Sequence, residues 1–92
     1  MAEPVDAKFQ IINRLGLHAR AAAQFVKTAN RYAAEVLVAK DGDEVNGKSI
    51  MGVLMLAAAK GSEIEVRTEG ADAQACLEAL GALIADKFGE GE

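Results

Sequence analysis

The sequence predicts an α+β fold, a two-layer open-faced sandwich in which helices cover one face of a four-stranded antiparallel sheet. Short segments with strand-like alternation are interleaved with amphipathic segments of helical period, in the order β-α-β-β-α-β-α. The chain has 92 residues and 51% hydrophobic content, enough for one hydrophobic core but not for two. We therefore expect one domain with its core from about residue 7 to residue 88, and an untethered tail, GEGE.

The first strand and the first helix flank the stretch GLHAR. Residues 8 to 12, KFQII, alternate as a strand does, and the polar pair Asn13 and Arg14 is expected to end that strand. From residue 19 to residue 30 the larger apolar side chains recur at helical spacing, while polar and charged residues share the opposite stripe. We expect this helix to bury the face formed by Ala22, Phe25, Val26 and Ala29.

A hairpin and a short helix form the middle of the chain. Residues 35 to 40, EVLVAK, and residues 43 to 45, DEV, predict two strands, since the Asp-Gly pair between them tolerates the positive φ of a tight turn. Ser49 stands where a helix N-cap belongs, because a serine hydroxyl accepts a bond from a free backbone N–H. The segment IMGVLM after it predicts a short helix, and Gly61 is expected to close that segment.

The last strand and the last helix have the clearest patterns. Residues 63 to 68, EIEVRT, alternate strictly and predict an antiparallel strand with Ile64 and Val66 facing the core. Gly81 predicts a close approach of the final helix to the sheet, since glycine costs about 1 kcal/mol there relative to alanine. That helix is expected to begin after Asp72, as N-cap, and to bury Ala73, Cys76, Leu77, Leu80, Leu83, Ile84 and Phe88.

The charge distribution argues against nucleic acid as a partner. The net charge is −4, and residues 49 to 92 carry eight acidic against three basic side chains. Apart from Phe9, the strands also lack aromatic residues on which bases could stack. A local basic patch is better suited to an acidic protein, and the candidates for it are Arg14, Arg20, Lys27 and Lys48.

The ends, the apolar runs and the cysteine content predict a cytoplasmic location. The first nine residues, MAEPVDAKF, lack the apolar segment of a secretory signal, and the longest apolar run, VLMLAAA, is too short to cross a bilayer. We expect no membrane insertion. The single cysteine, Cys76, has no partner for an internal disulfide, as is usual in a reducing compartment, and it is expected to act as a small apolar residue.

His18 is the only histidine in the chain. If the helix begins just after it, the ring lies beside first-turn N–H groups that have no helical partner and carry the positive end of the helix dipole. A neutral imidazole is a competent nucleophile near pH 7, and a phosphoryl group on it would be held by these N–H groups and by Arg20. A surface histidine that merely caps the helix is the alternative, and the residues alone leave both open.

Other chemistries have less support in the sequence. Metal binding would need more ligands, because there is no second histidine and the one cysteine belongs to an apolar stripe. A Ser-His-Asp hydrolytic site is not expected either, because the nucleophile-elbow pattern is missing. We therefore expect neither a metal nor a permanent cofactor.

Two motifs are similar to those of one bacterial family. GLHARAAAQFV resembles the active-site segment of HPr, the histidine-containing phosphocarrier of the phosphoenolpyruvate-dependent sugar phosphotransferase system, with its pattern Gly-Leu-His-x-Arg-Pro-Ala. NGKSIMGVLMLAAAKGSEIEV resembles the regulatory-serine region of that family, in the form recognised by HPr kinase/phosphorylase. The similarity covers about residues 7 to 88 and implies a single HPr-like domain over residues 1 to 92.

The resemblance implies roles for individual residues. His18 would be phosphorylated on the ring nitrogen nearer the backbone, Arg20 would steady the phosphoryl group, and Ser49 would be the regulatory phosphorylation site. The face that docks partners would include Arg14, Ala23, Lys27, Ile50 and Met51, although core packing is the other interpretation of the last two. The implied partners of this monomeric carrier are enzyme I, IIA domains, the HPr kinase/phosphorylase and transcriptional regulators.

Two departures from the family pattern and two rival functions stay open. Ala21 stands where the motif has proline, which leaves one additional N–H at the helix start. The extension KFGEGE puts in doubt any role of a terminal carboxylate near Arg20. A nitrogen-type paralogue would run the same chemistry for signalling. A regulatory binding module would use the Ser49 surface and leave His18 idle.

Overall fold

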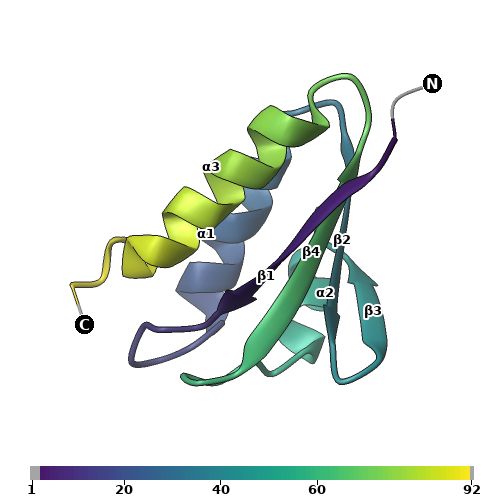
Figure 1. Ribbon diagram of the computed structural model, residues 1–92. Helices are drawn as coiled ribbons and strands as arrows, with labels where there is room; N and C mark the ends of the chain where they lie inside the picture. The colour runs from purple at the N-terminus through teal and green to yellow at the C-terminus, as the bar shows by residue number, and fades with distance from the viewer. Residues whose placement is uncertain (1–2, 92) are drawn as a thin grey trace.

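The computed structural model describes residues 3–91 and confirms the predicted order of elements (Figure 1). Helices and strands alternate as expected, and a short 3₁₀ turn follows the last helix. The elements are β1 (Val5–Gln10), α1 (Ala19–Ala29), β2 (Glu35–Lys40), β3 (Asp43–Asn46), α2 (Ile50–Met55), β4 (Glu63–Glu69), α3 (Ala73–Ala85) and η1 (Lys87–Gly89).

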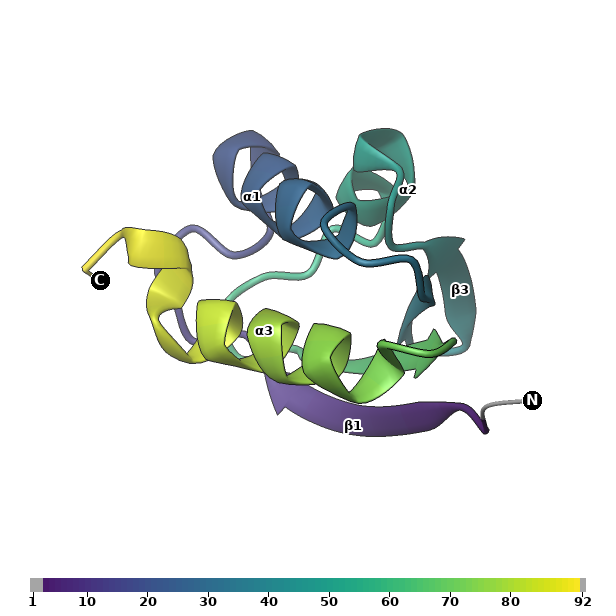
Figure 2. The same ribbon diagram turned by 90° about the horizontal axis from the view of Figure 1, so that it is seen from above.

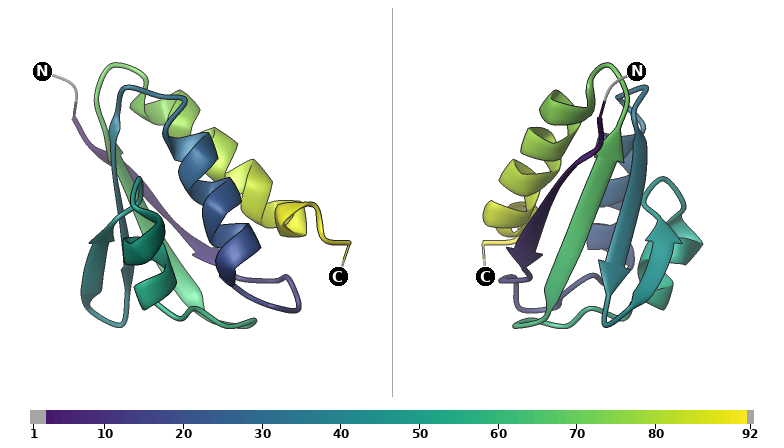
Figure 3. Two further views of the ribbon diagram at one scale, coloured as in Figure 1. Left: turned by 180° about the vertical axis from the view of Figure 1, so that it is seen from behind. Right: turned by 45° about the vertical axis from the view of Figure 1, so that its right-hand side comes forward.

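The sheet is antiparallel throughout, and its strand order is β1-β4-β2-β3. All three helices lie on the same face of it, as the view from above and the two turned views show (Figures 2 and 3). Ile64 and Val66 of β4 are buried under the helices, which confirms the side predicted from the alternation. The fold is therefore the expected open-faced sandwich, with the other sheet face uncovered.

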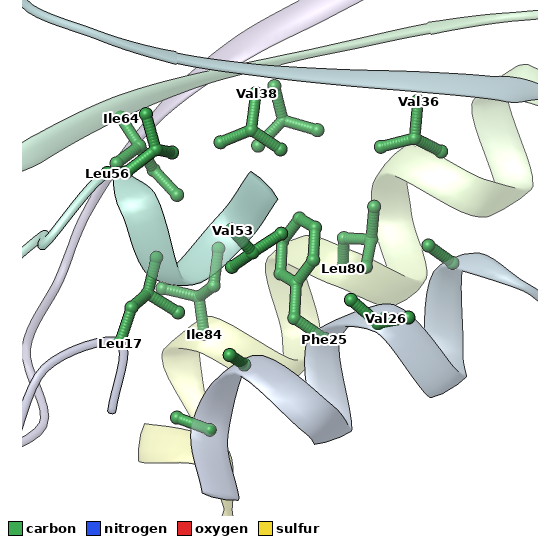
Figure 4. Packing of buried hydrophobic residues seen from close by; sticks show 14 of the residues in the cluster. Leu17, Phe25, Val26, Val36, Val38, Val53, Leu56, Ile64, Leu80 and Ile84 are labelled. Carbon is green, nitrogen blue, oxygen red and sulfur yellow. The ribbon is translucent and has the colours of Figure 1, made fainter. Parts of the chain in front are cut away.

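The core lies between the sheet and the helices. Phe25 of α1 is fully buried, and it points toward the sheet among residues contributed by β2, α2 and α3 (Figure 4). Gly81 of α3 lies against Phe9 of β1 so closely that a Cβ there would be 2.8 Å from the Phe9 ring. The predicted close approach is confirmed, and it explains why a poor helix former occupies a helix interior.

The turns of the hairpin and of α2 differ in how well the sequence predicted them. Asp41 and Gly42 both have positive φ, at 52° and 88°, as a two-residue hairpin turn requires. The prediction that Gly61 closes the α2 segment was wrong. The helix ends at Met55, and Ala57 already leaves helical geometry with φ of 48°.

Three further boundaries are corrected by the structure. β1 ends at Gln10, two residues before the predicted end, and Asn13, which was expected to end the strand, is fully buried in the loop that follows it. α3 ends at Ala85, so Phe88 packs into the core from η1 with φ of 54° rather than from the helix. Asp72 is at the N-cap position, but its carboxylate accepts bonds from the backbone N–H groups of residues 33 and 34 instead of capping α3.

Candidate functional site

His18 is the N-cap residue of α1, and its side chain makes no bond to its own helix. The His18 carbonyl accepts the first helical hydrogen bond, from the Ala22 N–H at 2.8 Å. The N–H groups of residues 19 to 21 precede that bond, so they have no acceptor within the helix. The ring therefore lies at an open, electropositive helix end, and its side chain is 28% exposed. The predicted helix start is confirmed.

A tight loop carries the chain from β1 to His18. Gly16 has φ of 67°, and a Cβ at this position would be only 2.5 Å from the Ala58 carbonyl oxygen. The next residue, Leu17, is buried and donates its N–H to that same oxygen at 2.8 Å. Because only glycine fits both the backbone angle and the space, the loop is held against residue 58 and presents His18 outward.

The tail returns to this loop, contrary to the prediction that GEGE is untethered. The Asn13 amide donates to the Gly16 carbonyl at 2.8 Å and to Glu90 Oε1 at 2.9 Å. The second carboxylate oxygen, Oε2, contacts His18 Nε2. The Glu90 side chain is only 11% exposed. Glu90 and Asn13 thus belong to the site, although the sequence analysis assigned neither of them to it.

The charge state of Glu90 follows from these contacts. The hydrogen bond from Asn13, and after it the contact with His18, hold the pKa of the Glu90 carboxyl below its ordinary value, against a smaller opposing effect of burial. The positive charge of Arg20 acts in the same direction. Glu90 is therefore a carboxylate at neutral pH.

A shallow pocket of about 290 Å³ surrounds the ring. Arg20 is exposed at its edge, so the two residues predicted for phosphoryl chemistry are brought together. Guanidinium groups bind phosphate oxygens through planar, charge-assisted hydrogen bonds. The pocket is lined by Arg14, Leu15, His18, Arg20, Gly89 and Glu90.

Ser49 lies at the start of a different helix. Its hydroxyl oxygen accepts a hydrogen bond from the Gly52 N–H at 3.2 Å, which confirms the predicted cap of α2. Ile50 and Met51 are 44% and 69% exposed, so the core-packing interpretation of these two residues was wrong. Met55, which is not among the predicted docking residues, is 76% exposed and adds to this apolar surface.

The basic candidates separate into two groups. Arg14, Lys27 and Ala23 beside it are exposed, as a docking face requires. Lys48 instead donates from Nζ to the Tyr32 carbonyl at 2.7 Å, so its ammonium group fastens two parts of the chain together. Lys48 is therefore a weaker candidate for a basic patch than the sequence analysis proposed.

Within the residues that the structure describes, the cysteine and the potential metal ligands form no second site. Cys76 is fully buried in α3, and burial raises the pKa of its thiol, which makes it a core residue as predicted. Among residues 3–91 no cluster of three or more potential His, Cys, Asp or Glu ligands could hold a metal ion. Within the same range, no helix is long and apolar enough to cross a membrane.

Known proteins resemble this chain over most of its length. The family model for the PTS HPr component phosphorylation site matches residues 5–86. Phosphocarrier protein HPr of Neisseria meningitidis serogroup A is 57% identical over 83 residues, covering 90% of this chain and 93% of that protein. The crystal structure of HPr-C-His from Thermoanaerobacter tengcongensis has a TM-score of 0.91 at 42% identity and covers 94% of this chain and 97% of that one.

A second solved structure agrees with the first. HPr from Bacillus anthracis has a TM-score of 0.83 and 49% identity, covering 86% of this chain and 94% of that one. The matched region contains the loop, both helix starts and the sheet described above, and residues 1–4 and 87–92 lie outside the family model. This chain belongs to the HPr family, the phosphocarriers of the phosphotransferase system.

Proposed function

We propose that His18 is the residue that carries the phosphoryl group, which it receives from phosphorylated enzyme I and passes to a histidine of a IIA-type protein. One observation carries this proposal. The imidazole of His18 is partly exposed at the N-terminus of α1, and it does not cap that helix. The chain acts as a carrier in the cytoplasm, and its partners supply most of the catalytic machinery.

The transfer requires a nucleophile and compensation of negative charge. The ring nitrogen nearer the backbone attacks phosphorus, while the free N–H groups of the first helical turn and the Arg20 guanidinium offset the charge of the phosphoryl oxygens. Arg20 lines the same pocket as His18, and the first-turn N–H groups have no acceptor within the helix, so both kinds of donor are available to a phosphoryl group on the ring. The residues of the pocket perform this role without a metal or a cofactor.

Partners dock on the surface around the two helix starts. Ile50 and Met51 supply exposed apolar area, and Arg14 and Lys27 supply positive charge at its border. Such a surface suits an acidic partner, because complementary charge speeds encounter while modest apolar burial allows release. Ala23 on the exposed side of α1 completes this face, and Leu15 and Met55 extend it.

Phosphorylation of Ser49 regulates this docking. The hydroxyl already lies at the start of α2, next to the exposed Ile50, so a phosphate there leaves the fold intact. Its charge of about −2 would lie beside the surface that meets acidic partners. The modification therefore weakens docking rather than folding, and an HPr kinase/phosphorylase is the enzyme suited to it.

Incubation with enzyme I and phosphoenolpyruvate tests the role of His18. The parent chain should acquire one acid-labile, base-stable phosphate, and a His18→Ala variant should acquire none while its circular dichroism stays unchanged. Phosphate that persists in His18→Ala would contradict the proposal. Chase with IIA proteins of sugar and nitrogen-type branches then separates the two forms of carrier function.

A further inference from the structure

The carboxylate of Glu90 is held from two sides, although 72 residues separate it from His18. Asn13 binds Oε1, and Asn13 is itself fully buried and fixed to the Gly16 carbonyl of the loop that seats His18. Oε2 is thereby directed at His18 Nε2. Asn13, Glu90 and His18 therefore form a hydrogen-bonded chain in which a carboxylate orients a histidine, as in catalytic triads.

The contact determines where the ring proton lies. Glu90 is ionised at neutral pH, because its hydrogen bonds lower the pKa of the carboxyl, and an ionised carboxylate only accepts hydrogen bonds. The proton between Glu90 and His18 is therefore on Nε2. In the neutral ring the lone pair then belongs to Nδ1, the nitrogen nearer the backbone.

We propose that Glu90 is a positioning residue: it fixes the Nε2–H tautomer of His18, directs the phosphoryl group to Nδ1, and retains the Nε2 proton in the phosphorylated ring. This inference rests on the proposed role of His18 as phosphoryl acceptor. It gives the carboxyl-terminal extension a function in transfer through a side-chain carboxylate.

Atoms and charges balance in both directions of transfer. The Nδ1 lone pair forms the new N–P bond, the N–P bond of the donor histidine breaks, and its electron pair stays on the donor ring. His18 becomes a phosphoimidazolium that keeps its Nε2 proton, with the carboxylate of Glu90 as counter-charge. In the onward step the N–P bond electrons return to Nδ1 and the leaving group is a neutral imidazole. Loss of the Nε2 proton would make it an imidazolate, a far poorer leaving group.

Among the described residues that line the pocket, Glu90 is the acidic one. Arg14 from the loop and Arg20 from α1 line the same pocket, and guanidinium groups stay protonated across the pH range of interest. Lys87 in η1 is the other cation of the tail segment. These cations are the same in the parent chain and in Glu90→Gln, so a difference between the pH profiles of the two proteins is assigned to the carboxylate.

Glu90→Gln tests the proposal because it removes the charge and keeps the shape. In ¹⁵N spectra of the unphosphorylated parent chain above pH 7.5, we expect His18 to be almost wholly the Nε2–H tautomer. In Glu90→Gln we expect a mixture, since an amide both donates and accepts. Glu90→Asp should partly restore the parent spectrum. Glu44→Gln, an exposed glutamate on β3, is the matched control and should change nothing.

The phosphorylated chain supplies the second readout. We expect onward transfer from Glu90→Gln to fall about tenfold at pH 8.5 and to approach the parent rate as the pH is lowered, because solvent then supplies the proton that Glu90 holds in the parent chain. The proposal would be overturned if Glu90→Gln had the same His18 tautomer and the same pH dependence of onward transfer as the parent chain. The tautomer measurement needs no partner, so failure of enzyme I to label the parent chain would count against the proposed function alone.

Discussion

α1 and α2 lie side by side over the sheet, and their N-cap residues differ in whether they bond to their own helix (Figure 2). Ser49 turns its hydroxyl oxygen to the Gly52 N–H and satisfies its own helix. His18 makes no such bond, so the first-turn N–H groups of α1 stay available to an outside group. The start of α2 is therefore closed by its own cap, which adds stability, while the start of α1 is left open to an anion.

The tertiary structure maintains this difference. A histidine contributes no cap, so α1 forgoes the roughly 1 kcal/mol that a serine cap contributes. The ring is instead held by Glu90, and the loop is held by Gly16 against the Ala58 carbonyl. The open helix end therefore depends on two contacts from distant parts of the chain. One comes from Glu90, the residue after η1, and the other comes from Ala58 in the loop before β4.

His18→Ser should have the largest effect, because it makes the start of α1 chemically like the start of α2. We expect complete loss of acid-labile phosphate after incubation with enzyme I. The free energy of unfolding of the serine variant should be about 1 kcal/mol higher than that of His18→Ala, since the serine hydroxyl caps the first turn. Urea denaturation of the two variants checks this. Equal stabilities would mean that the N–H groups of α1 already have another partner.

Gly16→Ala should disrupt the open end by distorting the loop. The new Cβ would meet a carbonyl oxygen at 2.5 Å on a backbone with φ of 67°, so we expect a loss of at least about 3 kcal/mol. Gly42→Ala is the matched control: φ is 88° there, but nothing lies within 4 Å. It should lose only about 1 kcal/mol. Similar losses for both in thermal unfolding would show that residue 58 yields easily.

Ser49→Asp and Ser49→Ala separate charge from capping at the closed end. Asp keeps a capping oxygen and adds a negative charge, so we expect stability within about 0.5 kcal/mol and about tenfold slower phosphoryl transfer from enzyme I. Ala removes the cap without adding charge, and it should lose about 1 kcal/mol with an unchanged transfer rate. Quench-flow kinetics with enzyme I distinguish the two; equal rates would remove the proposed regulation.

Ala21→Pro should have the smallest effect, because the N–H at position 21 precedes the first helical bond. We expect a stability change within about 1 kcal/mol and slightly faster hydrolysis of the phosphohistidine, since one donor is lost. Ala22→Pro is the control. The N–H of Ala22 donates to the backbone carbonyl of His18 at 2.8 Å, so proline should destabilise the chain by about 3 kcal/mol. A large loss in Ala21→Pro would show that the N–H at position 21 is already engaged.

The sequence predicted the elements better than it predicted their ends. Alternation placed Ile64 and Val66 correctly, because burial on one sheet face imposes a period of two on the residues themselves. Gly61 and Phe88 were assigned wrongly, since each chain turn depends on positive φ at Ala57 and Lys87, residues whose types give no sign of it. The burial of Asn13 was not predicted, because nothing local in the sequence distinguishes a buried asparagine from an exposed one.

Local pattern by itself determined where α1 begins, where Ser49 caps α2, and that His18 and Arg20 share a helix start, because each depends on residues at most a few positions apart. The tertiary structure alone decided that Asn13 and Glu90 join them. Contacts across 72 residues have no period and no spacing in the sequence. They exist only once α3 has packed on the sheet and η1 has turned the tail back to the imidazole.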